Sequence, residues 1–357
     1  MSRLGSIGAN LYHGHVSYDF VGKRRIWYSI SAVILLLAIA GLGFRGLNEG
    51  IEFKGGAEFQ LKAASASVAT ARTAAASVGQ SDAIVTLVGG SQVRVQTGAI
   101  DEPTSQKVVN ALAAAFHVNS SEVKVQLVGP TWGGDITSKA VQGLIVFLLL
   151  VILFLALYFE WKMAVGAMVA LAHDLVITIG VYALVGFEVT PATVIGVLTI
   201  LGYSLYDTVV VFDKVKENTR GIAGQSRRTY SAAANLALNQ TVVRSINTSL
   251  VAILPVAAIL VIGAGLLGAG TLKDLALALF VGMIAGTYSS IFVATPVLAQ
   301  LKETEPAMKA VAKRVAQRGG DQTAVAVGTA VTPVATGAHV KAAGPRVQPR
   351  RQPKRKR

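Results

Sequence analysis

Cysteine is absent from the 357-residue chain, which excludes a disulfide framework and any thiolate metal site. Charged residues are also scarce: they make up 15% of the chain, whereas hydrophobic residues make up 52%. Mean hydropathy is positive. An ordinary soluble domain of this length is less apolar. The composition therefore predicts a membrane protein.

Several catalytic motifs are missing as well. The sequence contains no phosphate-binding loop, no His-Glu-x-x-His zinc motif and no Gly-x-Ser-x-Gly nucleophile elbow. The early histidines His13 and His15 have no third ligand nearby in the sequence, which disfavours a metal site there. We therefore expect no enzyme activity, no cofactor and no metal. Any work done by the protein must draw on another source, such as an ion gradient.

Positive charge is concentrated at the end of the chain. Much of the formal net charge of +14 follows Glu305 and culminates in "RVQPRRQPKRKR". We expect residues 303–357 to form a disordered basic tail. Such a tail could bind anionic lipid or RNA, but a topology-fixing role in the cytoplasm is the favoured interpretation.

Six mostly apolar stretches approach or exceed the roughly 20 residues that a membrane-spanning helix needs. They are Ile26–Phe44, Ala140–Phe159, Met163–Val185, Pro191–Phe212, Thr241–Ile262 and Leu275–Leu301. We divide the chain into residues 1–25 (N-terminus), 26–46 (first span), 47–139 (a loop domain), 140–302 (five further spans) and 303–357 (tail).

The distribution of lysine and arginine predicts the orientation. Basic residues precede the first span, separate the fourth from the fifth, and follow the sixth. With six crossings these segments share one side of the membrane. We therefore expect both termini in the cytoplasm and residues 47–139 outside.

The loop domain shows a different hydrophobic pattern. "IEFKGGAEFQLK", "AIVTLVG", "SQVRVQTG" and "EVKVQLVG" alternate like strands, whereas "SVATARTAAASVG" and "PTSQKVVNALAAAFHV" have helical spacing. The order βαββαβ predicts a ferredoxin-like α+β domain, a small sheet covered by two helices.

Few ionisable residues fall inside the predicted spans. His173 and Asp174 lie near the middle of the third, Asp207 lies near the cytoplasmic end of the fourth, and Arg244 lies at a similar depth in the fifth. A charge at the bilayer centre costs about 2.5–3.5 kcal/mol on insertion scales, so such residues are candidates for function.

We predict that Asp207 binds and releases a proton and that Arg244 modulates it. The two could instead form a structural ion pair, with the Arg244 guanidinium reaching the headgroups. For His173 and Asp174, a proton relay and a structural hydrogen bond are both open. In the sixth span, Gly282, Gly286, Ser289 and Ser290 are small enough to let helices approach closely.

The stretch "GYSLYDTVVVFDKVKEN" resembles the fourth-span signature of the SecD/SecF family of bacterial protein-export subunits. "EGIEFKGGAEF", "VGPTWGGDITSKA", "AHDLVITIG" and "NQTVVRSINTSL" resemble further segments of that family, in the same order. The resemblance extends from about Lys23 to Leu301. It departs from the usual pattern at Glu52, where aspartate is common, and at Tyr206, where asparagine is common.

The resemblance implies a six-span half of an RND-like transporter in the bacterial cytoplasmic membrane. It implies SecD as the paired subunit, the SecYEG channel with SecA and YajC as further partners, and an unfolded preprotein as the substrate. It also implies proton coupling through the charges at Asp207 and Arg244.

Two alternatives remain open at this point. One is an RND-like proton-coupled exporter of small molecules or lipids, although a full-length exporter would need a second set of six spans. The other is a scaffold in which Asp207 and Arg244 only hold helices together.

Overall fold

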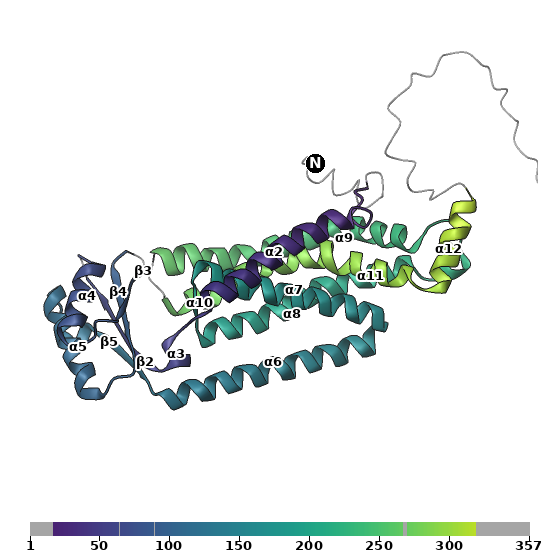
Figure 1. The fold of residues 1–357 in the computed structure, drawn as a ribbon. Coiled ribbons are helices and arrows are strands. Elements are labelled where there is room, and N and C mark those ends of the chain that lie inside the picture. The colour runs from purple at the N-terminus through teal and green to yellow at the C-terminus, as the bar shows by residue number, and fades with distance from the viewer. Residues whose placement is uncertain (1–16, 64, 89, 267–269, 319–357) are drawn as a thin grey trace, which may run out of the picture.

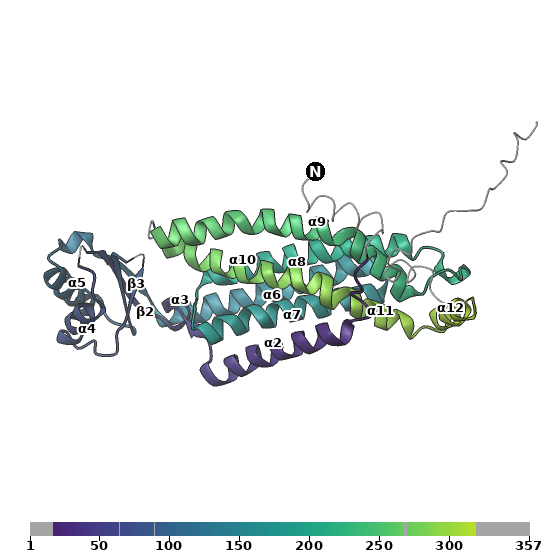
Figure 2. The ribbon, with the colours of Figure 1, turned by 90° about the horizontal axis from the view of Figure 1, so that it is seen from above.

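The computed structural model describes residues 17–318 apart from residues 64, 89 and 267–269. A long bundle of helices carries a small α/β domain at one end and a short helix, α12, at the other (Figure 1). A view from above shows the same arrangement, with α2 along one side of the bundle and α9 along the other (Figure 2).

Within the described residues, six helices are long and apolar enough to cross a membrane, which confirms the predicted number. The helices of the bundle are α2 (Arg24–Arg45), α6 (Pro130–Tyr158), α7 (Trp161–Val185), α8 (Pro191–Asn218), α9 (Tyr230–Ala258) and α10 (Gly270–Ser289). The π-helix η3 (Ile259–Leu266) extends α9, and the π-helix η4 (Ser290–Ala294) followed by α11 (Thr295–Glu303) extends α10.

Several helices are longer than the apolar runs that predicted them. Helix α6 begins at Pro130, ten residues before the predicted start at Ala140, and α9 begins at Tyr230 rather than Thr241. Proline suits the first turn of a helix because its missing N–H would be unpaired there anyway. Hydropathy locates the part of a helix that lipid can cover, whereas the hydrogen-bonded backbone continues into polar surroundings.

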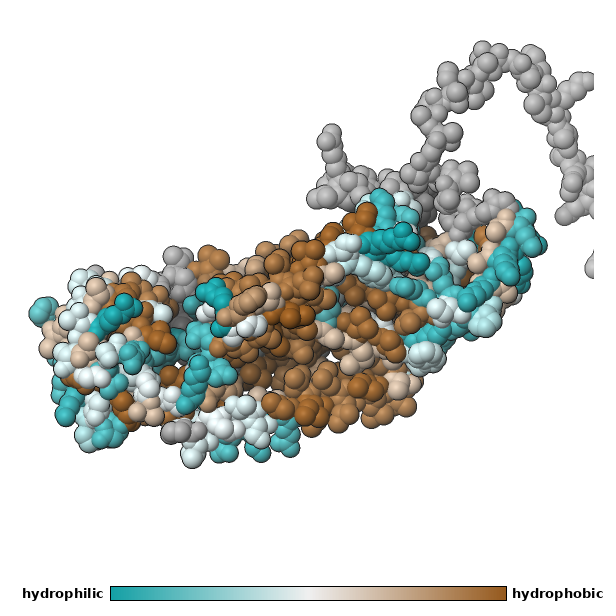
Figure 3. All heavy atoms as spheres, viewed as in Figure 1, coloured by the Kyte–Doolittle hydropathy of each residue, from teal (hydrophilic) through white to brown (hydrophobic). Residues whose placement is uncertain are grey.

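The surface of the bundle is apolar. A belt of hydrophobic residues lies between hydrophilic ends (Figure 3). Large side chains such as Leu36, Leu157 and Val251 are well exposed on α2, α6 and α9. An apolar belt of this size on the outside of a helical protein is typical of a lipid-facing surface. The structure thus agrees with the composition: this is a membrane protein.

The α/β domain follows α2. Its elements are β2 (Gly56–Lys62), α4 (Val68–Ser77), β3 (Ile84–Val88), β4 (Gln92–Thr97), α5 (Glu102–Phe116), the 3₁₀ turn η1 (Ser120–Glu122) and β5 (Lys124–Val128). The strands lie in the order β3-β4-β2-β5, and every neighbouring pair is antiparallel. Phe59, Val93 and Val95 from the sheet pack with Leu112 and Ala75 from the two helices.

A second, very short sheet links the domain to the bundle. β1 (Asn48–Glu49), just after α2, pairs in parallel with β6 (Glu188–Val189), which lies between α7 and α8. Between β1 and β2 lies the one-turn helix α3 (Ile51–Lys54). Two-residue strands give no periodic pattern, so sequence analysis could not find this pairing.

Both ends of the described chain lie at the end of the bundle opposite the α/β domain (Figure 1). The expectation of disorder from residue 303 onward was wrong for residues 306–317, which form α12 (Pro306–Gln317). Its Val311 and Val315 are buried, because apolar residues four apart form one face of the helix. Residues 319–357, which hold the rest of the predicted tail, lie outside the described residues, as do residues 1–16.

Candidate functional site

The centre of the bundle is formed by close contact between α8 and α10. A Cβ atom on Gly286 would lie 2.9 Å from the Cβ of Ser204, and one on Gly196 would lie 2.8 Å from that of Ala278. Real Cβ atoms essentially never approach other heavy atoms so closely. The small residues noted in the sixth span therefore let two backbones meet, as is common in membrane helix pairs.

Asp174 of α7 is fully buried at this contact. Its Oδ2 accepts hydrogen bonds from Ser204 Oγ of α8 at 2.5 Å and from Ser289 Oγ of α10 at 2.7 Å. Its Oδ1 lies 3.2 Å from His173 Nδ1. The carboxyl group thus joins three helices through neutral hydroxyl groups and one imidazole.

His173 is also buried, with 5% of its surface exposed. Its ring stacks on Tyr288 with 5.9 Å between ring centroids. The Tyr288 hydroxyl in turn reaches Ser31 Oγ and the Trp27 carbonyl of α2. His173 Nε2 is buried and has no hydrogen-bond partner among the described residues. Although consecutive on a helix, His173 and Asp174 contact each other through their side chains.

Asp207 of α8 lies nearby on the same buried face as Ser204, three residues along the helix. It is 5% exposed, and its Oδ2 accepts a hydrogen bond from Ser290 Oγ at 2.5 Å. Ser290 is the first residue of the π-helix η4. Single π-helical turns within α-helices are frequent at functional sites.

Arg244 is placed differently from the other three candidate residues. It is exposed on α9 and lines a groove of about 990 Å³ together with Asp213, Glu217 and Asn247. Among the described residues, no ion pair joins Arg244 to Asp207. The structure therefore brings His173 and Asp174 into contact, and it pairs Asp207 with the hydroxyl of Ser290. Arg244 instead faces a groove at the predicted cytoplasmic side.

Further hydroxyl groups line the contact between α8, α9 and α10. Ser249 Oγ of α9 accepts hydrogen bonds from Tyr203 Oη at 3.2 Å and from Thr287 Oγ1 at 2.8 Å. Ser245, one turn earlier on α9, has a buried Oγ without a partner among the described residues. The hydrogen bonds of Ser249 connect the helix of Arg244 to α8, which carries Asp207, and to α10.

Sequence analysis missed Ser204 and the polar role of Ser289 and Ser290. A serine in a membrane helix costs little, so no energetic argument singles it out as it does a carboxylate. The available signal was spacing, since Ser204 and Asp207 are three apart and share a helical face. Which serine meets which aspartate depends on how the helices pack.

Two family matches cover much of the chain. Residues 107–304 match the family described as "Protein export membrane protein SecD/SecF, C-terminal", and residues 40–66 match the SecD/SecF GG motif. The sequence is 56% identical over 316 residues to the protein translocase subunit SecF of Streptomyces coelicolor, covering 88% of this chain and 85% of that one. It is 46% identical over 330 residues to SecF of Mycobacterium tuberculosis, covering 89% and 75%.

The fold has a solved counterpart. The crystal structure of SecDF, a translocon-associated membrane protein from Thermus thermophilus, superposes with a TM-score of 0.71 and 31% sequence identity. The match covers 81% of this chain and 39% of that one. The present chain therefore spans well under half the length of its structural relative.

Proposed function

Because the chain belongs to the SecD/SecF family of protein-export membrane proteins, we propose that it couples proton movement at Asp207 to preprotein transport. Its relatives are named as translocase subunits, which supports a role in Sec protein export. The proposal adds an energy source and assigns roles to particular residues. Asp207 takes up and releases the proton, and Arg244 responds to its charge.

The observation that carries this proposal is the type of partner that each buried carboxyl group has. Asp207 and Asp174 accept hydrogen bonds from serine hydroxyls, and no lysine or arginine pairs with either among the described residues. A hydroxyl can donate to a carboxylate or accept from a carboxylic acid. The same serine contacts can therefore serve both protonation states, as a proton-binding site requires.

Asp174 and His173 form a second candidate proton-binding site. The two side chains contact each other at 3.2 Å, and His173 Nε2 has no partner among the described residues, so this imidazole nitrogen is available to exchange a proton. Ser289 donates to Asp174 and the next residue, Ser290, donates to Asp207. The His173–Asp174 pair and Asp207 are therefore bound to neighbouring residues of the sixth span. We propose that His173 and Asp174 relay protons to or from Asp207.

Arg244 supplies the positive charge in this scheme. It lies in a groove on the adjacent helix, and an arginine that approaches a carboxylate favours its charged form. We propose that α9 moves relative to α8 during the cycle and brings Arg244 toward Asp207 when the proton leaves. The apolar exterior of α9 would permit such a movement within lipid.

A longer relative supports the proposal of a paired subunit. The SecDF protein of Thermus thermophilus matches this chain over only 40% of its own length. We propose that a separate SecD subunit supplies the remainder, and that the pair works with SecYEG, SecA and YajC on unfolded preproteins. An exporter of small molecules or lipids is less well supported, since the relatives are named as protein translocase subunits.

We also propose an orientation. Both termini lie in the cytoplasm, and the α/β domain is an extracytoplasmic, ferredoxin-like domain. The strand order β3-β4-β2-β5 with α4 and α5 on one face supports the ferredoxin-like assignment. The start of α2 and the loop between α8 and α9 carry basic residues and lie at the end of the bundle opposite the α/β domain, which supports the orientation.

The test is preprotein translocation into inverted membrane vesicles, with and without a proton gradient. Asp207→Asn removes the titratable group and keeps an oxygen for Ser290. Asp135→Asn, an exposed carboxylate of α6 that lies outside the groove of Arg244, is the control. We expect Asp207→Asn to lose the gradient-stimulated part of transport and Asp135→Asn to retain it. An unchanged gradient response in assembled Asp207→Asn complexes would refute proton coupling at this site.

A further inference from the structure

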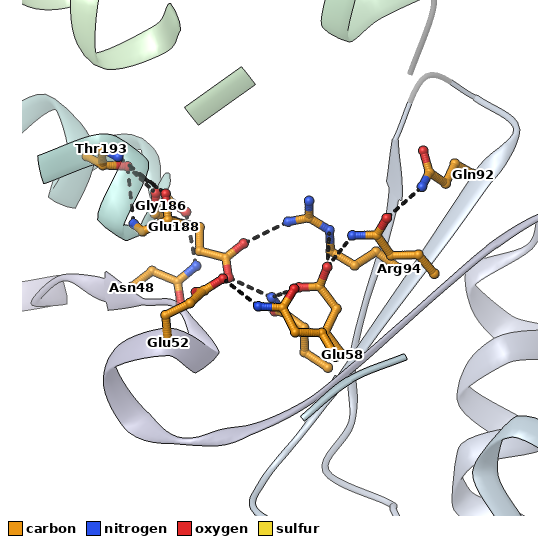
Figure 4. A network of polar contacts seen from close by, with 12 residues as sticks. Asn48, Glu52, Glu58, Gln92, Arg94, Gly186, Glu188 and Thr193 are labelled. Carbon is orange, nitrogen blue, oxygen red and sulfur yellow. Dashed lines mark hydrogen bonds and ion pairs between the residues drawn. The ribbon is translucent and has the colours of Figure 1, made fainter. Parts of the chain in front are cut away.

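A buried cluster of charged residues connects the α/β domain to the bundle (Figure 4). Arg94 of β4 lies at its centre. Arg94 Nη1 is 3.0 Å from Glu188 Oε2, and Arg94 Nε is 3.4 Å from Glu58 Oε1. All three side chains are at most 16% exposed. The cluster is therefore shielded from solvent, unlike ordinary surface ion pairs.

A second residue of the same strand reinforces the contact. Gln96 Nε2 donates to Glu188 Oε1 at 2.6 Å and to Glu58 Oε2 at 2.9 Å. Both oxygens of Glu188 are thus held by β4, one by a cation and one by an amide. Side chains two apart on a strand point to the same face, which explains how β4 reaches Glu188 twice.

Glu188 belongs to the membrane bundle rather than to the α/β domain. It lies in β6, three residues after the end of α7 and three residues before the start of α8. Its carbonyl accepts a hydrogen bond from Thr193 Oγ1, which also forms a capping box with Thr190 at the start of α8. Its backbone is paired with Asn48 in the short parallel sheet. Glu188 is therefore firmly attached to the ends of both helices.

Those two helices carry the candidate proton-binding residues. Asp174 lies on α7 and Asp207 lies on α8. A helix held by continuous backbone hydrogen bonds moves largely as a rigid body. A displacement of α7 at Asp174 or of α8 at Asp207 therefore also displaces the α7–α8 turn. Within the described part of the chain, the side-chain hydrogen bonds from the four-stranded sheet to Glu188 of this turn come from Arg94 and Gln96.

We infer that the Arg94–Glu188 ion pair is the mechanical tether that transmits movement of α7 and α8 to the α/β domain. Arg94 and Glu188 are positioning residues in this inference, which rests on the proposed proton coupling. In this arrangement the α7–α8 turn pulls or releases strand β4, and the sheet follows because β4 is an interior strand bonded to β3 and β2.

The charge balance makes Arg94 the more sensitive partner. The cluster contains the carboxyl groups of Glu58 and Glu188, with Glu52 close by and its Oε2 buried without a partner among the described residues. Removal of Arg94 leaves Glu58 and Glu188 without the cation that pairs them. Carboxylates left buried without a counter-charge repel each other, so we expect loss of Arg94 to separate the domain from the turn.

The transport assay in inverted vesicles tests this tether in the assembled complex. Arg94→Gln removes the cation, and Glu188→Gln keeps an acceptor for Arg94 without its charge. Arg72→Gln is the matched control, because Arg72 is an exposed arginine of the same domain with no ion pair in the described structure. Arg94→Lys tests whether charge alone restores function.

We expect Arg94→Gln to lose at least about nine-tenths of the gradient-stimulated rate and to keep the gradient-independent rate. Glu188→Gln should lose less, Arg94→Lys should recover part of the response, and Arg72→Gln should match the wild type. A full gradient response in assembled Arg94→Gln complexes would overturn the tether. The Asp207→Asn variant, measured in parallel, shows separately whether the proposed proton coupling holds.

A distance measurement distinguishes a tether from a purely structural contact. The chain has no cysteine, so spin labels can be placed at Gln106→Cys in the domain and Gly43→Cys on α2, both exposed positions. In the wild-type background we expect the inter-label distance to change when the gradient is applied. In the Arg94→Gln background we expect no change. An equal change in both backgrounds would also overturn the inference.

Discussion

Asp174 and Asp207 lie on different helices, yet each accepts a hydrogen bond from one of two consecutive serines. Ser289 Oγ donates to Asp174 and Ser290 Oγ donates to Asp207. Adjacent residues of an α-helix point about 100° apart, and here η4 begins between them. The sixth span therefore contacts both carboxyl groups through Ser289 and Ser290, and a movement of these two residues affects both groups.

The two aspartates differ in how many serine hydroxyls donate to them. Asp207 accepts a hydrogen bond from Ser290, whereas Asp174 accepts from both Ser204 and Ser289. A hydrogen bond to a charged group contributes about 1.5–3 kcal/mol, and 1.4 kcal/mol is about tenfold in rate. We expect Ser290→Ala to lower gradient-stimulated transport by about tenfold and Ser289→Ala to lower it less. Transport assays on both variants would measure this order, and equal effects would contradict it.

Close packing of α8 on α10 is open to a glycine substitution test. A Cβ on Gly286 would lie 2.9 Å from Ser204 Cβ and 3.3 Å from its Cα. We expect Gly286→Ala to lower the free energy of unfolding by about 1–3 kcal/mol, the usual cost of overpacking. Gly202→Ala on α8 is the control, because its Cβ would meet no atom within 4 Å. Thermal unfolding in detergent compares them; equal stabilities would show that the helices can separate without cost.

Glu52 makes the junction of domain and bundle sensitive to pH. Its burial raises its pKa above the ordinary value of 4.5, and Glu188 and Glu58 raise it further against the opposing effects of its backbone hydrogen bond and Arg94. The folded state therefore binds this proton more tightly than the unfolded state. The resulting stability is fully present below pH 4.5 and is lost as the pH rises through the raised value.

Glu52→Gln should remove this loss. We expect the variant to have a higher Tm than the wild type near neutral pH, and the difference to disappear in acid. Glu49→Gln, an exposed carboxyl group in the neighbouring strand, should change the Tm little. Tm measured as a function of pH provides the comparison. A Glu52→Gln curve parallel to the wild-type curve would be inconsistent with a raised pKa.

The segment before α2 is held to α9 by Asn239 and by Asn235, whose Oδ1 accepts a hydrogen bond from the Phe20 backbone N–H at 2.8 Å. Asn239 Oδ1 accepts from the Tyr18 backbone N–H at 2.8 Å, and its Nδ2 donates to the Tyr18 carbonyl at 2.9 Å. We expect Asn239→Ala to lower the free energy of unfolding by about 1–3 kcal/mol, because it removes partners of half-buried backbone groups. Faster proteolysis near Tyr18 should accompany this loss. Asn247→Ala, exposed on the same helix, should do neither.

Much of the architecture could be predicted from the sequence. Continuous apolar runs identified six spans because lipid leaves a helix no other way to satisfy its backbone. The cost of charge in lipid singled out His173, Asp174 and Asp207, and all three are buried in the bundle. Arg244 was selected by the same argument, but it is exposed in a groove, which is the position expected for a long side chain near a helix end.

Other features depended on the tertiary structure. Hydropathy and charge are properties of single residues and short windows, so the sequence by itself determined the spans, the α/β pattern and the rare intramembrane charges. Contacts between helices depend on distances across the fold. Packing alone decided that Ser289 and Ser290 meet two different aspartates, that Arg94 reaches the α7–α8 turn, and that residues 306–317 dock as a helix. Close helix approach at glycines and the two-residue strands β1 and β6 set the distances between these elements. Neither feature leaves a periodic signal in the sequence.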